Sequence, residues 1–466
     1  MQPSRAILVL VLLVVIAATL AQVVVRVRGE YVVGLAFLFA VFALVFIKTE
    51  VGLYLVLTSM LLSPEFAVGG GLAESRAVVL RLEDLLLVAI AFSWLAKTAV
   101  NKELGLVAKT PLNRWIVLYV VTTLAATLLG YLTGTVRTAA GFFYVLKYLE
   151  YFVVYYLTAN NLRDRAQAWR LVTTAFLTAT IVSLIGAAQI PTGQRVSAPF
   201  EGEVGEPNTM GGYLLFMIAI AVALALETER IKMRVAATAL AAVMAVPFLF
   251  TLSRASYLGV VPMILALAVL SSRRTLMLGV LVLALVAAPL LAPSILPAPV
   301  ARRVAYTFEA ERGQTTVRLG KVAFDPSTSE RLVSMQHALE GWMRRPVLGY
   351  GVTGFRFMDA QYARTLVETG IVGLAAFLAL VAALLRAGMV SYRHVRDPED
   401  RALALGFVAG TVGLLVHAVG ANTFIIVRIM EPFWFFAAVV IALPTLERGE
   451  RRFLAPVPAP PLGRLA

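Results

Sequence analysis

The chain has 466 residues, of which 60% are hydrophobic and only 15% are charged. This composition excludes an ordinary soluble domain and is typical of a polytopic membrane protein. The formal net charge of +14 would suit nucleic acid in a soluble protein. Here the basic residues lie in short loops between apolar runs, so we expect membrane lipids and no nucleic acid as partners.

Apolar runs long enough to cross a bilayer, or nearly so, recur along the chain and predict an all-α protein with about 12 to 14 transmembrane helices. The runs fall near 6–25, 31–47, 51–63, 84–97, 114–133, 140–158, 169–189, 209–227, 233–251, 256–271, 275–292, 365–386, 402–421 and 428–445. We interpret the first run as a retained span, because it is too long for a signal peptide and lacks an A-x-A cleavage site. The runs at 51–63 and 84–97 are short, and either is compatible with a re-entrant segment.

Basic residues gather in alternate loops, which orients the predicted spans with the N-terminus in the cytoplasm. The loop around Glu201, Glu203 and Glu206, on the opposite side, is acidic. We therefore predict an integral protein of the cytoplasmic membrane with both termini in the cytoplasm. Its four predicted regions are an N-terminal transmembrane bundle (1–292), a large external loop (293–364), C-terminal transmembrane helices (365–446) and a Pro-rich cytoplasmic tail (447–466).

The loop at 293–364 is mostly polar and too long for an ordinary connection, so we expect it to be functional. Ser327 and Glu330 have the spacing of a capping box. Apolar residues then recur at helical spacing from Leu332 to Met343, which predicts an amphipathic helix that ends before Pro346. We expect this helix to lie against the membrane or over the spans.

Two arginines and an asparagine stand beside apolar runs on the predicted outer side. Arg254 suits both a side chain that extends to the membrane interface and a fixed cation that faces a lipid phosphate. Arg195 and Asn208 bracket the acidic loop, where Asn208 is also a plausible helix cap.

The loop and the start of the next span carry further candidates. Arg331 lies on the amphipathic helix, either as a surface side chain or as part of a site. Arg364 and Glu368 have the spacing of an i,i+4 ion pair, whereas Asp359 falls outside that pairing and is a candidate general base. The glycines of this region, Gly349, Gly351 and Gly354, predict a tight turn where the backbone can approach a ligand.

Several kinds of chemistry are excluded or made improbable by what the sequence lacks. There is no cysteine, and the three histidines, His337, His394 and His417, lack metal-ligand spacing, so we expect no metal and no cofactor. Neither a Walker A motif nor a dinucleotide-binding motif is present. A group-transfer enzyme of this kind would need a donor that is already activated, such as a lipid-linked pyrophosphate.

Four segments resemble motifs of the O-antigen ligase and polymerase (WaaL/Wzy-like, Wzy_C) superfamily. SRASYLG resembles its S-R-x-x motif, and GEPNTMGGYLL is similar to its P-N-x-x-(G/A) loop. SERLVSMQHALEGWMRRPVLGYGVTGF resembles the pattern that closes the family's large external loop. DAQYARTLVETGIVGL resembles the segment that leads into the following span. These motifs cover about the second half of the chain.

The resemblance implies a metal-independent, inverting glycosyltransferase of the GT-C type. Such an enzyme moves a glycan from a polyprenyl-pyrophosphate carrier to a lipid-linked or sugar-linked acceptor. On this basis we predict that Arg254, Arg195, Asn208 and Arg364 bind the pyrophosphate and that Asp359 and Arg331 are catalytic. Gly349, Gly351 and Glu368 would then position the acceptor and the loop.

One departure from the family pattern bears on the reaction. Where ligases carry His-Asn, this chain has Asp359-Ala360. Either Asp359 accepts the acceptor proton, or the reaction needs no strong base because pyrophosphate is a good leaving group once it is neutralised. A polymerase, or a ligase with another acceptor, therefore gains weight. Alternatives from other classes are a flippase or transporter for polyprenol-linked sugars, for which we see no inverted repeat, and a non-catalytic subunit of an export complex.

Overall fold

A computed structural model of the chain describes residues 29–67, 79–100, 108–138, 140–200, 205–279, 282, 297–309, 316–319 and 322–449. The predicted span at 6–25, most of the run at 275–292 and most of the C-terminal tail lie outside these residues.

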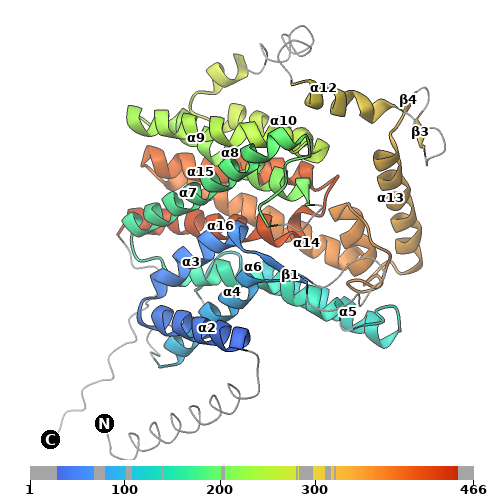
Figure 1. Cartoon of the computed structure of the whole chain (residues 1–466), viewed down its shortest axis with the longest axis horizontal. Helices are drawn as coiled ribbons and strands as arrows, with labels where there is room; N and C mark the ends of the chain where they lie inside the picture. Colours follow the sequence, from blue (N-terminus) through green and yellow to red (C-terminus); the bar gives the residue numbers. More distant parts are fainter. Residues whose placement is uncertain are drawn as a thin grey trace, which may run out of the picture.

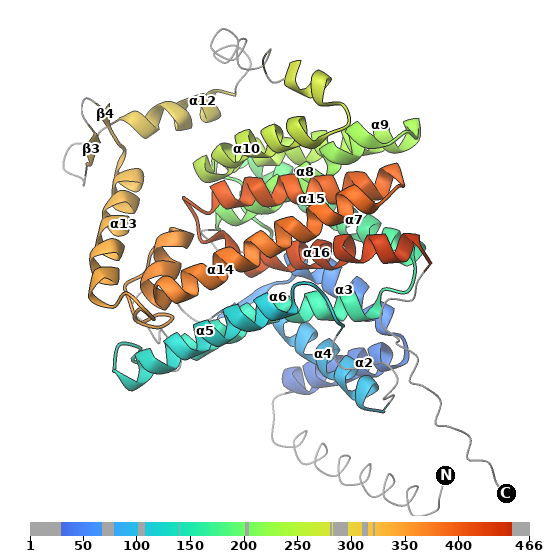
Figure 2. The ribbon, with the colours of Figure 1, turned by 180° about the vertical axis from the view of Figure 1, so that it is seen from behind.

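Long apolar helices make up most of the described structure (Figures 1 and 2). They are α2 (Gly29–Ile47), α3 (Thr49–Leu62), α4 (Leu82–Val100), α5 (Asn113–Leu132), α6 (Ala140–Asn161), α7 (Arg165–Gln189), α8 (Pro207–Glu227), α9 (Ile231–Phe250), α10 (Arg254–Leu270), α14 (Gln361–His394), α15 (Pro398–His417) and α16 (Val427–Glu447). Within the described residues, 7 of them (α5, α7, α8, α9, α14, α15 and α16) are long and apolar enough to cross a membrane. The predicted all-α polytopic fold is confirmed, and the count of 12 to 14 spans stays a prediction.

The centre of the bundle is formed by α8, α15 and α16. Of the 18 residues in the most apolar stretch of each helix, 89% are buried in α16 and 78% in α8 and α15. Small residues allow this close packing: a methyl group on Gly406 of α15 would meet the Cα of Ile220 in α8 at 2.5 Å. Close approach through small residues is the usual way for membrane helices to associate.

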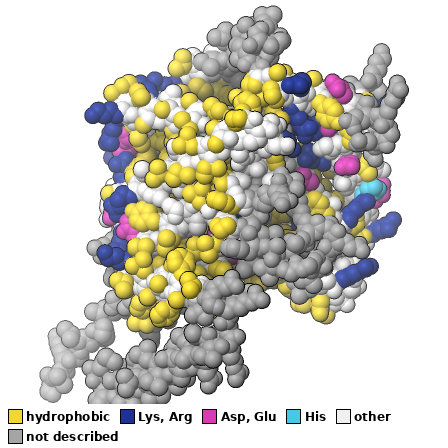
Figure 3. Space-filling model, viewed as in Figure 1, with side chains coloured by type: hydrophobic (Ala, Val, Ile, Leu, Met, Phe, Trp, Pro, Cys, Tyr) yellow, Lys and Arg dark blue, Asp and Glu magenta, His cyan; other side chains and the backbone are white. Residues whose placement is uncertain are grey.

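The surface between the two ends of the helices is largely hydrophobic. Figure 3 shows hydrophobic side chains across the middle of one face, with Lys and Arg side chains gathered at its left and right borders. The short apolar helices α2 and α10 also expose large hydrophobic side chains, whereas α3 is mostly covered. An apolar belt between two charged borders is what a bilayer requires of a spanning protein.

A loop between α10 and α14 extends from one end of the bundle, which we call the loop-bearing end. It contains α12 (Ala298–Ala305), η3 (Tyr306–Phe308), a hairpin of β3 (Arg318–Leu319) and β4 (Val322–Ala323), and α13 (Pro326–Arg344). Figures 1 and 2 show α13 running across the end of the bundle rather than along it. A second short hairpin, β1 (Glu65–Ala67) with β2 (Val79–Arg81), connects α3 to α4.

The predicted amphipathic helix is present as α13, but the predicted capping box is wrong. The helix begins at Pro326 with Asp325 as its N-cap, so Ser327 already lies inside the first turn. Proline is favoured at the first helical position because its ring fixes φ and it lacks the N–H that would be unsatisfied there. The hydroxyl of Ser327 instead accepts a hydrogen bond from Arg254 at 3.2 Å.

The far end of the loop is held by backbone hydrogen bonds to an interrupted helix. At Gly370, φ is 66°, which breaks the helical path of α14. The N–H of Ile371 donates to Pro346 O at 2.9 Å, and the N–H of Tyr350 donates to Val367 O at 3.0 Å. The segment that follows α13 therefore supplies partners for the groups that the break in α14 leaves unpaired.

Candidate functional site

Four arginines from four separate elements meet at the loop-bearing end, and we call them the arginine cluster. Arg195 comes from the loop before α8, Arg254 begins α10, Arg303 lies in α12 and Arg331 lies in α13. Burial, and then the positive charges of Arg303, Arg254 and Arg331, lower the pKa of Arg195 to about 10. Burial and repulsion from Arg254 and Arg331 also lower the pKa of Arg303. Mutual repulsion of this kind marks a site that favours an anion.

Arg254 is held by the start of α13. Its Nη1 and Nη2 atoms donate to the two carboxylate oxygens of Asp325 at 2.6 and 2.9 Å. Thr307 and Ser327 accept further hydrogen bonds from the same guanidinium at 3.1 and 3.2 Å. Burial opposes ionisation of Asp325, but the hydrogen bonds from Arg254 keep the pKa of Asp325 below its usual range. The guanidinium of Arg254, which the sequence predicts to bind pyrophosphate, therefore already binds one carboxylate through two hydrogen bonds.

Arg195 and Asn208 join the same site through the turn before α10. Arg195 donates to the carbonyl oxygens of Thr251 and Leu252 at 3.0 and 3.1 Å. Ser253, the N-cap of α10, donates to Asn208 Oδ1 at 2.8 Å. Both predicted residues therefore contact the three residues that precede Arg254, although Arg195 itself is 59 positions away from Arg254 in sequence.

Arg331 and Asp359 form an ion pair on the other side of the cluster. Arg331 Nη2 lies 3.0 Å from Asp359 Oδ2, and both side chains are partly exposed. Asp359 precedes α14, whose first residue Gln361 donates its N–H to Ala418 O after α15. The exposed carboxylate and the arginine cluster are therefore placed together, as a base beside an anion site would have to be.

The other predicted residues form a second, buried group. Arg364 Nε lies 3.2 Å from Glu368 Oε1, and both side chains are largely buried. The N–H of Thr353 donates to the same Glu368 oxygen at 3.1 Å. This arrangement fits the i,i+4 ion pair that the sequence allowed, with Glu368 also fixing the turn after α13.

The glycine turn packs against the protein itself. A methyl group on Gly349 would overlap the carbonyl oxygen of Val367, and one on Gly351 would meet the Ala126 carbonyl oxygen in α5 at 3.0 Å. The close backbone approach expected at these glycines is therefore an approach to α14 and α5. Gly349 and Gly351 also have φ values of 66° and 84°, which favour glycine.

Sequence reasoning did not single out three residues of this region: Arg303, Asp325 and His417. The Nε atom of Arg303 is buried without a hydrogen-bond partner among the described residues. His417, at the end of α15, is fully buried; its Nδ1 lies 2.7 Å from Thr423 Oγ1, and Gly212 packs beside its ring. Arg303 stands in a polar segment and was detectable, whereas His417 ends an apolar run that gives no signal.

Comparison with known proteins supports the same region. Residues 239–378 match the O-antigen ligase family (Wzy_C). The matched segment contains α10, α12, α13 and the first half of α14, and thus Arg254, Arg331 and Asp359. A search of curated proteins found no match. The resemblance seen in the sequence is confirmed over these residues, and it supports a membrane glycosyltransferase of the O-antigen ligase or polymerase kind.

Proposed function

We propose that this protein transfers a glycan from a polyprenyl-pyrophosphate carrier to the hydroxyl group of an acceptor sugar at the loop-bearing end of the bundle. The observation that carries the proposal is the arginine cluster: four guanidinium groups accompanied by two carboxylates, Asp325 and Asp359. If all of these groups are ionised, the cluster keeps an excess of two positive charges. A pyrophosphate that links a lipid to a sugar carries two negative charges.

In this proposal Arg254, Arg195 and Arg303 hold the pyrophosphate, with Asn208 beside them. Arginine suits this role because its planar fork binds phosphate oxygens through two hydrogen bonds and stays charged. Neutralisation of the phosphates makes the pyrophosphate a better leaving group, since negative charge grows on it in the transition state.

Asp359 then accepts the proton of the acceptor hydroxyl. The hydroxyl oxygen attacks the anomeric carbon as the bond from that carbon to the pyrophosphate breaks, and the electron pair leaves with the carrier pyrophosphate. A single displacement inverts the anomeric carbon. Arg331 pairs with Asp359 and holds its carboxylate beside the arginine cluster.

The experiment that tests this proposal separates a ligand role of Arg254 from a role in holding the loop. A strain that lacks the protein receives the wild type, Arg254→Lys, Asp325→Asn or the double variant Arg254→Lys/Asp325→Asn, and its surface and lipid-linked glycans are analysed. We expect Arg254→Lys to leave glycan on the lipid carrier, because the two-bond fork is lost. We expect Asp325→Asn to retain transfer, because the guanidinium remains.

Equal loss of transfer in Arg254→Lys and Asp325→Asn, with both proteins folded, would show that the pair only fastens the loop. Arg274→Ala is the matched control, because Arg274 is exposed near the opposite end of α10. The glycan pattern also separates the two family activities. Single repeats on the acceptor indicate a missing polymerase, whereas full-length glycan on the carrier indicates a missing ligase.

A further inference from the structure

A large cavity lies at the end of the bundle opposite the arginine cluster. It measures about 1500 Å³ and lies between α5, α14 and α16. The first residues of α5 and the last turns of α14 and α16 line it. The predicted orientation places this end in the cytoplasm. We propose that the cavity binds an anionic phospholipid of that membrane leaflet.

The cavity has a charged rim and an apolar wall. Its cationic residues are Lys109, Arg114, Arg386, Arg396 and Arg448, and His394 lies beside them. Its wall includes a stripe of small residues on α14, namely Ala379, Ala382, Ala383 and Ala387. Basic pockets between membrane helices on the cytoplasmic side bind anionic head groups, and an alanine surface accommodates the acyl chains.

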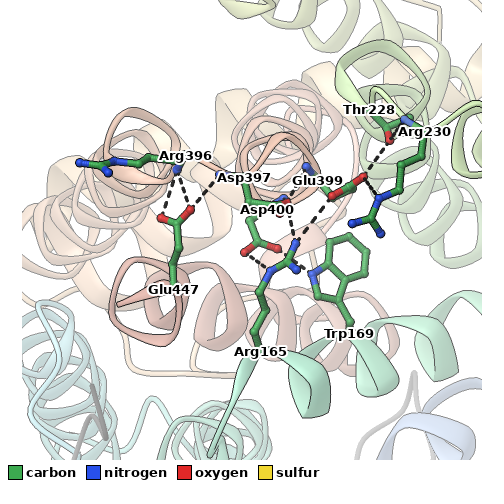
Figure 4. A network of polar contacts seen from close by, with 9 residues as sticks. All are labelled: Arg165, Trp169, Thr228, Arg230, Arg396, Asp397, Glu399, Asp400 and Glu447. Atoms are coloured by element: carbon green, nitrogen blue, oxygen red, sulfur yellow. Dashed lines mark hydrogen bonds and ion pairs between the residues drawn. The ribbon is translucent and has the colours of Figure 1, made fainter. Parts of the chain in front are cut away.

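The acidic residue of this lining, Glu447, is already satisfied by backbone groups. Its carboxylate accepts the N–H of Arg396 at 3.0 and 3.1 Å and the N–H of Asp397 at 2.8 Å (Figure 4). Figure 4 also shows the Arg396 side chain pointing away from this network. Glu447 is therefore committed to the turn between α14 and α15, and the Arg396 guanidinium stays available to a ligand.

The nearby carboxylates are engaged in a separate network. Arg165 pairs with Asp397 at 2.5 Å and with Asp400 at 2.7 Å, and Trp169 donates to Asp400 at 2.6 Å (Figure 4). Arg230 pairs with Glu399 at 3.3 Å. The acidic residues of the turn thus have other partners, and no carboxylate of the described residues pairs with the side chains of Arg386 and Arg396.

Arg386 gives the proposal its geometric basis. It lies on α14 eight residues before the helix ends at His394, a depth of about 12 Å along the helix axis. Its side chain is exposed, lines the cavity and has no ion pair or hydrogen bond among the described residues. An arginine on a lipid-facing apolar surface requires a counter-ion or a path to water. A lipid phosphate between Arg386 and Arg396 satisfies this requirement.

A second copy of this chain is a poorer occupant of the cavity, because its net charge of +14 would bring further positive charge.

The full-length protein, purified in detergent, tests the proposal by native mass spectrometry with phosphatidylglycerol or phosphatidylcholine. We expect phosphatidylglycerol to bind about tenfold more tightly, because its net negative charge is matched by Arg386 and Arg396 and one charge-assisted contact changes the affinity by about tenfold. We expect Arg386→Gln/Arg396→Gln to remove most of this preference. Arg393→Gln is the matched control, because Arg393 is exposed on the last turn of α14, between Arg386 and Arg396 in sequence, but does not line the cavity.

Equal binding of the two lipids by the wild type, or an unchanged preference in the double variant, would overturn the proposal. Inorganic phosphate that displaces phosphatidylglycerol at equal concentration would assign the cavity to a free anion instead. A photoactivatable phosphatidylglycerol on the unaltered protein gives an independent readout. We expect crosslinks to the stretch of α14 from Ala379 to Ala387, and crosslinks confined to other helices would contradict the assignment. The readouts do not involve glycan transfer, so this inference stands or fails separately from the proposed function.

Discussion

Arg254 and Asp325, which are 71 positions apart, form a two-bond ion pair that joins the first residue of α10 to the N-cap of α13. With its hydrogen bond to Thr307, the same guanidinium also fixes the segment after α12. Arg254, the main cation of the proposed pyrophosphate site, is therefore paired with a carboxylate of the loop. A phosphate that binds the two Nη atoms of Arg254 would compete with the Asp325 carboxylate, so in the proposed function donor binding and loop attachment share one side chain.

Asp325→Ala tests whether the Arg254–Asp325 ion pair stabilises the folded protein. Asp325 is fully buried, and removal of one partner of a buried pair typically costs about 3–5 kcal/mol. We expect a lower unfolding temperature in a thermal shift assay. Because the folded pKa of Asp325 is depressed, the stability from the pair is present above the unfolded pKa of about 3.9 and is lost as the pH falls through the folded value. Glu340→Ala, at an exposed site on α13, is the control, and an equal shift in both variants would contradict the prediction.

Alkaline pH tests Arg195 as a phosphate ligand. Arg195 carries its charge below a pKa of about 10, so we expect binding of a dialkyl pyrophosphate to weaken as the pH rises through that value. The charge of such a diester does not change in this range, so the loss reports on the protein. The measurement is an affinity titration at several pH values. We expect Arg195→Gln to bind weakly at neutral pH without this alkaline decline, and a wild-type affinity that is constant through the same range would contradict the role.

Asp359 variants separate a general base from a simple partner of Arg331. We expect Asp359→Asn to lower kcat by about 10²–10⁴ with little change in KM, because the amide cannot accept the acceptor proton. We expect Asp359→His to recover part of kcat, because imidazole can accept a proton at neutral pH. The measurement is initial-rate kinetics with a lipid-linked donor. A change in KM alone would indicate that the carboxylate only positions Arg331.

Gly370→Ala tests the break in α14. A methyl group there would overlap the Val347 carbonyl oxygen, and a φ of 66° is unfavourable for alanine. We expect strong destabilisation or loss of folded protein, measured as the monodisperse yield after solubilisation. Gly279→Ala is the control, because a methyl group at Gly279 has nothing within 4 Å. Comparable yields of the two variants would contradict the conclusion that the break in α14 requires glycine at position 370.

Most of the fold was predictable because a bilayer imposes long apolar runs. The run at 114–133 became α5 (Asn113–Leu132), and the run at 428–445 became α16 (Val427–Glu447). The boundary of α13 was less predictable, because Ser327 and Asp325 both suit a helix start. In the structure Asp325 is the N-cap, and both Asp325 and Ser327 contact Arg254, which lies far away in sequence.

The site was predictable only in part. Motifs led to Arg254, Arg331 and Asp359, since these residues stand in recognisable local sequence. The partner of Arg254 could not be found this way, because an ion pair across 71 positions leaves no periodic signal. The burial of the Arg364–Glu368 pair likewise depends on how α14 packs against α5, which no local sequence pattern reveals.

The two ends of the external loop are attached by different kinds of bond. At the α14 end, the loop is attached by backbone hydrogen bonds, such as that from the Tyr350 N–H to Val367 O, which do not involve side chains. At the α12 end, the attachment to the bundle includes one guanidinium that an anion can take. The loop is therefore attached through backbone groups after α13 and through the Arg254 side chain before α13. If the proposed donor takes Arg254 from Asp325, the α12 end of the loop loses this attachment while the α14 end keeps its backbone hydrogen bonds.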